Sequence, residues 1–279
     1  MKSPLRKRLL RELKSEFGKY LVVFIMMAIT IGFVSGFLVA DGSMLRAYDD
    51  SFQKYNIEDG YFQTKKKLTP AQKEDIEKSD VKVYENFYIE QKLTNGSTIR
   101  FFKNRKEVDK VCLMNGKMPK KSGEIAVDRM YADNNELKVG DTVKSRKKTF
   151  RITGLVALSD YSALFQNNND TMFDAVKFGV AIVTDKDFEA LNQVKVPYNY
   201  AWIYDKKPAT EKKEKKMAED LMEDMADVVT IESFVPQYQN QSIHFTGDDM
   251  GSDRAMIVML LYIVMAILAF VFGITISNT

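Results

Sequence analysis

Two long runs of apolar residues stand at either end of a chain whose middle alternates between polar and apolar positions. Residues 20–40 and 255–277 are stretches of 21 and 23 residues without a charged side chain. At a rise of 1.5 Å per residue, a helix of either length crosses the hydrocarbon core of a bilayer, which is about 30 Å thick. The pattern predicts two transmembrane helices, at 20–40 and 255–279, because core helices of soluble proteins seldom lack charges over so many residues.

Short strand-like and helix-like patterns fill residues 41–254, between the two runs. Thr69-Pro70-Ala71-Gln72 carries the N-cap, the first-turn proline and the capping-box glutamine that begin a helix. Asn95-Gly96 separates two β-patterned runs and is a strong hairpin signal. The predicted strands are Gly60–Thr64, Val81–Leu93, Ser97–Asn104, Tyr198–Asp205 and Val228–Phe234, with helices over 70–78 and Ala209–Asp227. Two βαβ-like halves predict an α/β sandwich that is split in the sequence.

An insertion of different texture, at about 105–190, separates these halves. It is rich in glycine turns and short β-runs, namely Glu124–Val127, Asp141–Ser145, Phe150–Leu158 and Phe178–Thr184. Residues 159–174 are expected to form a polar loop, and 235–254 a connector into the second helix. The predicted fold class is an α+β membrane protein: two transmembrane helices flank a split α/β domain with an inserted small β-rich subdomain.

The basic charge of the chain is concentrated before the first apolar run. Residues 1–19 contain seven basic and two acidic residues, a net charge of +5, whereas the remainder has a net charge of −2. Basic residues flank the cytoplasmic side of membrane helices, so the N-terminus is expected in the cytoplasm and the central domain outside the cell membrane. Residues 1–19 also match an amphipathic helix lying at the inner membrane surface, against lipid. With its basic excess explained in this way, the chain is not expected to bind nucleic acid.

Both apolar runs carry small residues at nearly four-residue spacing. They are Ala28, Gly32, Gly36 and Ala40 in the first run and Ala266, Ala269 and Gly273 in the second. Small residues at this spacing form a groove where another membrane helix can approach closely. The pattern predicts helix packing, within this chain or against a partner.

The sequence contains no recognisable catalytic or metal-binding constellation. Gly116-Lys117 is followed by Met118, so no phosphate-binding loop is completed, and neither CxxC nor HExxH occurs. The single cysteine, Cys112, is expected to be buried, and the single histidine, His244, to be exposed. We therefore predict no catalytic, cofactor-binding or metal-ligating residue, and no enzyme activity in this chain.

Four short motifs in the insertion occur in a recognisable order. They are Gly116-Lys117-Met118-Pro119, Gly123-Glu124-Ile125-Ala126-Val127, Val139-Gly140-Asp141-Thr142-Val143 and Phe150-Arg151-Ile152-Thr153-Gly154-Leu155-Val156. The series resembles that of the extracytoplasmic domain of FtsX/MacB/LolE-type ABC transporter permeases. The resemblance marks Gly116, Pro119, Gly123, Glu124, Gly140, Asp141 and Gly154 as fold-determining residues, and the family supplies no catalytic residue in this region.

The resemblance implies a mechanical role. A separate cytoplasmic ATPase subunit would bind ATP and magnesium, and the transmembrane helices would carry its movement to the outer domain, for export of a lipid, lipoprotein or peptide or for signalling. A second permease copy or a homologue of it is the expected membrane partner. Because the family has four transmembrane helices, we expect this chain to be the N-terminal part of a permease. The alternative is a membrane-anchored extracellular sensor, which has the same order of helix, outer domain and helix.

Overall fold

The chain divides into two compact units, each described here by itself. The computed structural model describes residues 14–15, 17–146, 148–191 and 198–277. Unit 1 comprises the chain up to Tyr48 and from Asp248 onward, and unit 2 comprises Asp49–Gly247. The amphipathic helix predicted for residues 1–19 lies largely outside the described residues.

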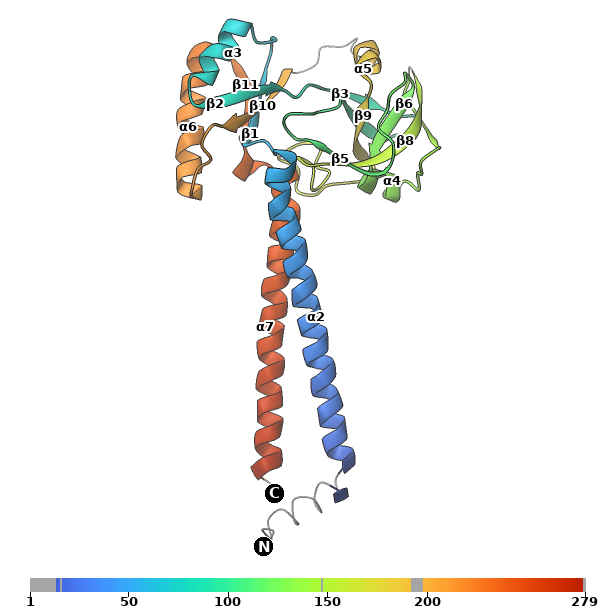
Figure 1. Cartoon of the computed structure of the whole chain (residues 1–279), viewed down its shortest axis with the longest axis vertical. Coiled ribbons are helices and arrows are strands. Elements are labelled where there is room, and N and C mark those ends of the chain that lie inside the picture. Colours follow the sequence, from blue (N-terminus) through green and yellow to red (C-terminus); the bar gives the residue numbers. More distant parts are fainter. Residues whose placement is uncertain (1–13, 16, 147, 192–197, 278–279) are drawn as a thin grey trace. The chain divides into compact units, whose positions relative to one another are not determined.

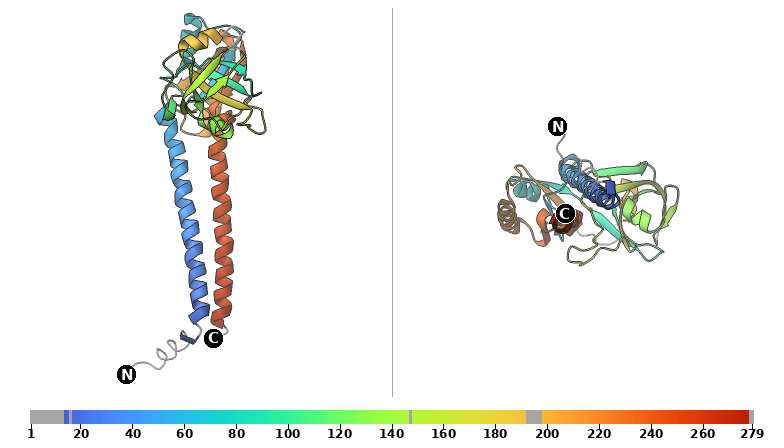
Figure 2. Two further views of the ribbon diagram at one scale, coloured as in Figure 1. Left: turned by 90° about the vertical axis from the view of Figure 1, so that its right-hand side faces the viewer. Right: turned by 90° about the horizontal axis from the view of Figure 1, so that it is seen from below.

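Unit 1 consists of parts of two long helices, α2 (Phe17–Tyr55) and α7 (Gln241–Ser277), which run side by side in opposite directions (Figures 1 and 2). By length and composition, both can cross a membrane, and neither buries its apolar stretch within the chain. Asp41 and Arg254 form an ion pair between the two helices, 3.9 Å apart. The connector predicted for 235–254 is wrong from Gln241 onward, because α7 begins there; its polar first turns continue directly into the apolar run.

A four-stranded antiparallel sheet and two helices form one half of unit 2. The strands β1 (Gly60–Thr64), β2 (Val81–Glu85), β10 (Tyr198–Tyr204) and β11 (Ile231–Pro236) lie in the order β11-β1-β10-β2. Helix α3 (Pro70–Glu77) connects β1 to β2, and α6 (Glu211–Val228) connects β10 to β11. Each βαβ half therefore places one strand between the two strands of the other half. This interleaving confirms the predicted split α/β part.

Local signals and one apolar core explain this half. Thr69 caps α3 with the predicted capping box: its hydroxyl accepts a hydrogen bond from the Gln72 amide, and Gln72 Oε1 accepts one from the Thr69 amide. Alternate strand residues such as Phe62 and Trp202 are fully buried and join Leu221 of α6 in this core. The opposite face of the same strands is left for other contacts.

A seven-stranded mixed sheet forms the other half, larger than the predicted insertion of 105–190. Its strands are β3 (Tyr88–Lys92), β4 (Thr98–Phe102), β5 (Val111–Gly116), β6 (Glu124–Asp128), β7 (Thr142–Lys144), β8 (Thr149–Leu158) and β9 (Phe178–Val183), in the order β3-β4-β9-β6-β8-β5 with β7 beside β8. The remaining elements are α4 (Arg129–Asn134), α5 (Asp185–Leu191) and the 3₁₀ helix η1 (Gln237–Gln239). The hairpin predicted at Asn95-Gly96 is confirmed as β3 and β4.

Two predictions about strands need correction. The run Val81–Leu93 is two strands, β2 and β3, in different sheets, because the chain crosses between the sheets at the buried Asn86. The Asn86 amide donates to the Asn199 carbonyl at 2.9 Å, and the Asn86 carbonyl accepts from Asn199 Nδ2 at 3.2 Å. The strand β5 was not predicted, and it forms one edge of its sheet. Cys112 lies on that edge and is partly exposed rather than buried. An edge strand has no neighbour to cover its outer side.

Candidate functional site

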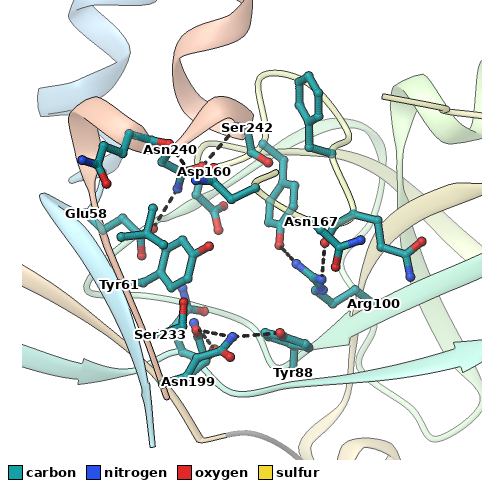
Figure 3. Close-up of a pocket in the computed structure, with 18 of the residues that line it drawn as sticks. Glu58, Tyr61, Tyr88, Arg100, Asp160, Asn167, Asn199, Ser233, Asn240 and Ser242 are labelled. Atoms are coloured by element: carbon teal, nitrogen blue, oxygen red, sulfur yellow. Dashed lines mark hydrogen bonds between the residues drawn. The ribbon is translucent and has the colours of Figure 1, made fainter. Parts of the chain in front are cut away.

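A polar cavity of about 450 Å³ lies between the two sheets of unit 2 (Figure 3). Its walls come from the four-stranded sheet, from β3 and β4 of the seven-stranded sheet, from the loop after β8, and from the segment that leads into α7. The lining residues are Glu58, Tyr61, Gln63, Asn86, Tyr88, Arg100, Phe102, Asp160, Tyr161, Phe165, Gln166, Asn167, Asn168, Asn169, Asn199, Ser233, Phe234, Val235, Gln239, Asn240 and Ser242. None of them was predicted from the sequence as a site residue.

The first wall is one face of the four-stranded sheet, and the alternation of side chains along its strands decides which residues face the cavity. Phe62 of β1 points into the core beneath the helices, so its neighbours Tyr61 and Gln63 point to the opposite face. Gln63 lies in register between Ser233 of β11 and Asn199 of β10. These three polar residues therefore form a row across the sheet on its cavity face.

The second wall is the outer face of the β3–β4 hairpin, centred on Arg100. Its Nε donates to Glu90 Oε1 at 2.9 Å and its Nη1 donates to the Tyr161 hydroxyl at 2.6 Å. The guanidinium also stacks over the Tyr88 ring, 4.1 Å from the ring centre. Arg100 is 9% exposed, and its charge is neutralised by Glu90 before any ligand arrives.

The third wall is the loop at 159–174, which was predicted to be polar. It is polar only in part, because Ala163, Leu164 and Phe165 are buried. Asn168 holds the loop to the segment before α7: its side chain donates to the Gln239 carbonyl at 2.8 Å and accepts from the Gln241 amide at 2.9 Å. The tandem amides 166–169 are the only signal of this wall in the sequence.

A buried charged cluster closes one end of the cavity. Arg105 forms a two-point ion pair with Asp160, at 2.7 and 2.5 Å, and both side chains are 7% exposed. Asp109 is fully buried and accepts hydrogen bonds from the Glu58 amide at 2.8 Å and from Asn86 Nδ2 at 3.1 Å. Asn240 Nδ2 donates to Glu58 Oε1 at 3.3 Å.

The two carboxyl groups of Glu58 and Asp109 favour holding a proton. Burial, followed by the neighbouring charges of Asp109 and Asp160, raises the pKa of Glu58 well above its ordinary value. Burial and the charge of Asp160 likewise raise the pKa of Asp109 to about 7. The second oxygen of Glu58, Oε2, is buried and has no donor among the described residues. A protonated Glu58 that donates to Asp109 accounts for the raised pKa of Glu58, the raised pKa of Asp109 and the lack of a described donor to Glu58 Oε2.

This arrangement is suited to binding a polar molecule. Within the described part of the chain, no group of three or more His, Cys, Asp or Glu side chains could hold a metal ion. Cys112 does not line the cavity, and neither does His244, which is half-buried beside Phe52 instead of exposed as predicted. Chemically, the walls offer hydrogen-bond donors and acceptors next to aromatic faces.

The residues of the four sequence motifs lie on β5, β6, β7 and β8 and in the turns beside them, and none of them lines the cavity. Gly116 pairs with Gly154. A methyl group built on Gly116 would lie 2.4 Å from the Thr153 carbonyl oxygen, and one built on Gly154 would lie 2.6 Å from the Lys117 carbonyl oxygen. Gly116 also has a positive φ of 75°. The two paired backbones can therefore lie this close together only because both residues lack a side chain.

The other motif residues form turns beside the Gly116–Gly154 pair. Glu124 Oε2 accepts from the amides of Lys120 and Lys121, just after Pro119, at 2.8 and 2.9 Å. Asp141 Oδ2 accepts from the Lys138 amide at 2.8 Å. The Gly140 amide donates to Ile152 of β8 at 2.8 Å, and the Gly123 carbonyl accepts from the Arg151 amide. Each of these contacts maintains the sheet.

The small residues of the long helices face open space. Ala28, Gly32, Gly36, Ala40 and Ala266 are exposed, and nothing lies within 4 Å of a methyl group built on Gly32 or Gly36. The side chain of Ala269 and the position of Gly273 on the surface lie outside what the structure describes. Packing of this face against another helix stays a prediction.

In comparisons with known proteins, the chain matched solved structures only. No protein-family model matches the chain, and no curated protein does. The chain is similar to the extracellular domain of the noncanonical ABC-type transporter YknZ from Gram-positive bacteria, at 11% identity and a TM-score of 0.32, over 62% of this chain and 98% of that one. It is also similar to the periplasmic region of MacB from Actinobacillus actinomycetemcomitans, at 13% identity and a TM-score of 0.35, over 62% of this chain and 87% of that one. Likenesses at these scores carry no argument about function.

Proposed function

We propose that this chain is the membrane permease subunit of an ABC transporter, or part of one. Helices α2 and α7 would cross the cell membrane with the N-terminus in the cytoplasm, and unit 2 would lie outside. A separate ATPase subunit would bind and hydrolyse ATP with magnesium, so this chain would hold no cofactor and perform no catalysis. The complete assembly would contain lipid and a second permease copy.

One observation carries the proposal: the motif residues that define the family resemblance are the residues that build the close pairing of β5 with β8 and the turns beside it. Gly116 and Gly154 meet where β5 and β8 pair, with the Gly123-Glu124 and Gly140-Asp141 turns beside them. This β-rich part is inserted into a split α/β sheet, which itself lies between two apolar helices in the sequence. A chance match of four short motifs would have no reason to converge on one structural feature.

The proposed mechanism is mechanical transmission. Binding and hydrolysis of ATP by the partner would shift an equilibrium between two arrangements of the transmembrane helices, and unit 2 would follow. The small-residue face of α2 would pack against a partner helix in at least one arrangement, because lipid-facing helices associate where backbones can approach closely. The output would be export of a lipid, lipoprotein or peptide, or a signal.

The testing experiment is co-purification of the gene product, in detergent, with the ATPases encoded beside its gene. We expect a stable complex whose ATPase rate is stimulated. Gly32→Leu and Gly36→Leu should lower that stimulation, whereas Gly42→Leu makes the same substitution in α2 outside the four-residue series and should not. All three positions have open space in this chain, so the substitutions leave its own fold intact.

Absence of any ATPase complex, or stimulation that is equal in the three variants, would contradict this proposal. The alternative of a membrane-anchored sensor is favoured by one observation, the polar cavity of unit 2. A sensor would show a ligand-dependent change in unit 2 without an ATPase partner.

A further inference from the structure

We propose that the cavity between the two sheets of unit 2 is a binding site for a small, uncharged, hydroxyl-rich ligand of the saccharide class. The inference goes beyond the permease role and does not depend on it, because it rests on the cavity alone. Four properties of the cavity support it: its chemical composition, the state of its charges, its unused hydroxyl groups and its preformed walls.

The composition of the walls is the first support. Nine of the 21 lining residues are asparagine or glutamine, and six are aromatic. Each amide group combines acceptors and donors, which suits adjacent hydroxyl groups that both donate and accept. An aromatic ring offers an apolar face to the C–H side of a sugar ring. A volume of about 450 Å³ is within the usual range for a small-molecule site.

The charges argue against an ionic ligand. Both arginines near the cavity are already neutralised, Arg100 by Glu90 and Arg105 by Asp160. An anion would therefore meet no free cation among the described lining residues. The remaining pair of acids, Glu58 and Asp109, is fully buried at one end, with the Asp109 carboxylate already accepting two hydrogen bonds from Asn86 and the Glu58 amide. A cation would have to displace a proton that burial stabilises.

Two hydroxyl groups on the first wall have no hydrogen-bond partner among the residues that the structure describes. Tyr61 and Ser233 both line the cavity, and neither hydroxyl makes a hydrogen bond to any described residue. Figure 3 shows Tyr61, Asp160, Asn167 and Asn199 among the labelled residues that surround the space. Nearby polar groups in the same walls are held in place by the protein. These hydroxyls are therefore available for a ligand.

The walls are also fixed before a ligand binds. Gln63 Nε2 on β1 donates to the Tyr88 hydroxyl on β3 at 3.0 Å and to Asn199 Oδ1 on β10 at 3.3 Å, which links the two sheets across the cavity. The Arg100 guanidinium fixes Tyr161 and the Gln166 carbonyl in the same way. A preformed site loses little side-chain entropy on binding, so modest polar contacts are sufficient for affinity.

The test is a binding titration of the whole chain, purified in a detergent that has no sugar headgroup. Glucose, N-acetylglucosamine and lactose are the neutral probes, and saturation-transfer NMR reports binding. Glucosamine and glucuronate carry the same ring with one positive or one negative charge. We expect at least one neutral saccharide to bind, and the charged rings to bind about tenfold more weakly or not at all.

Variants locate the binding to this cavity. Tyr61→Phe removes only the unused hydroxyl and should weaken binding about three- to tenfold, the usual value of one hydrogen bond. Ser233→Ala should act in the same direction. Tyr84→Phe makes the same change at a tyrosine of β2 outside the cavity and should have no effect.

Three results would overturn the proposal. They are failure of all three neutral saccharides to bind, tighter binding of a charged ring than of its neutral counterpart, and binding that Tyr61→Phe and Ser233→Ala leave unchanged. Because the readout is binding and no ATPase is present, each result is independent of the test of the permease function.

Discussion

At the scale of single residues, Glu58 and Asp109 are the clearest case of chemistry imposed by burial. Both carboxyl groups have a raised pKa in the folded chain, so the folded state holds protons that the unfolded chain releases. Stability from this pair is fully present below about pH 4, the ordinary pKa of a carboxyl group. It is lost as the pH rises through the raised pKa values, of which that of Asp109 is about 7. The pair therefore destabilises unit 2 at neutral and alkaline pH.

Glu58→Gln should remove much of this pH dependence. Glutamine has the shape of the protonated acid, can donate to Asp109 and can accept from Asn240, but does not ionise. We expect its melting temperature to equal that of the parent near pH 4 and to exceed it by several degrees at pH 8. The fluorescence of Trp202, the single tryptophan and fully buried in unit 2, reports unfolding.

The matched control is Glu107→Gln, the same change at an exposed position. It should leave the pH profile as in the parent. Parallel pH profiles for Glu58→Gln and the parent would show that Glu58 is ionised in the fold.

At the scale of elements, the close pairing of β5 and β8 explains why glycine occurs at fixed places in the inserted sheet. Gly116 has both a positive φ and a backbone oxygen 2.4 Å from where its methyl group would be. Gly123 also has a positive φ, 88°, but open space around it. Gly123 therefore needs glycine for its backbone conformation alone, whereas Gly116 needs it for its conformation and for lack of space.

Alanine substitutions at these two glycines should therefore differ in cost. We expect Gly123→Ala to lower the free energy of unfolding by about 1 kcal/mol, the strain of a left-handed alanine. Gly116→Ala should cost at least about 2 kcal/mol more, because the strands must move apart. Urea unfolding followed by circular dichroism measures both. Equal costs would mean that β5 is free to shift away from β8.

At the scale of the whole molecule, the central question is on which side of the membrane unit 2 lies. Cys112 is the only cysteine, and it is partly exposed on the edge strand β5. A thiol reagent that cannot cross membranes therefore reports the location of unit 2 without any added cysteine. The charge of +5 before the first apolar run predicts an outside location.

We expect Cys112 to be labelled by an impermeant maleimide in intact cells. The Cys112→Ser variant should show no labelling, and a detergent-solubilised sample defines the maximum. Labelling that appears only after the cells are permeabilised would place unit 2 in the cytoplasm and would contradict the proposed topology.

Patterns confined to neighbouring residues were sufficient to predict many elements. The alternation in Gly60–Thr64, the capping box at Thr69 and the Asn95-Gly96 turn each act over a few residues, so β1, α3 and the β3–β4 hairpin follow from the sequence. The same holds for the two apolar runs. The split α/β part with a β-rich insertion could also be predicted, since each βαβ half is contiguous.

Only the tertiary structure decided the partners of these elements. Placing β10 between β1 and β2 brings Asn199 beside Gln63, residues that lie far apart in the sequence, and this pairing creates the cavity wall. The raised pKa of Glu58 likewise comes from its burial and, after that, from the charges of Asp109 and Asp160 beside it. No local pattern encodes such contacts, because their energy depends on burial and on distant neighbours. The sequence by itself determined the elements and the two apolar helices, whereas long-range packing decided the site.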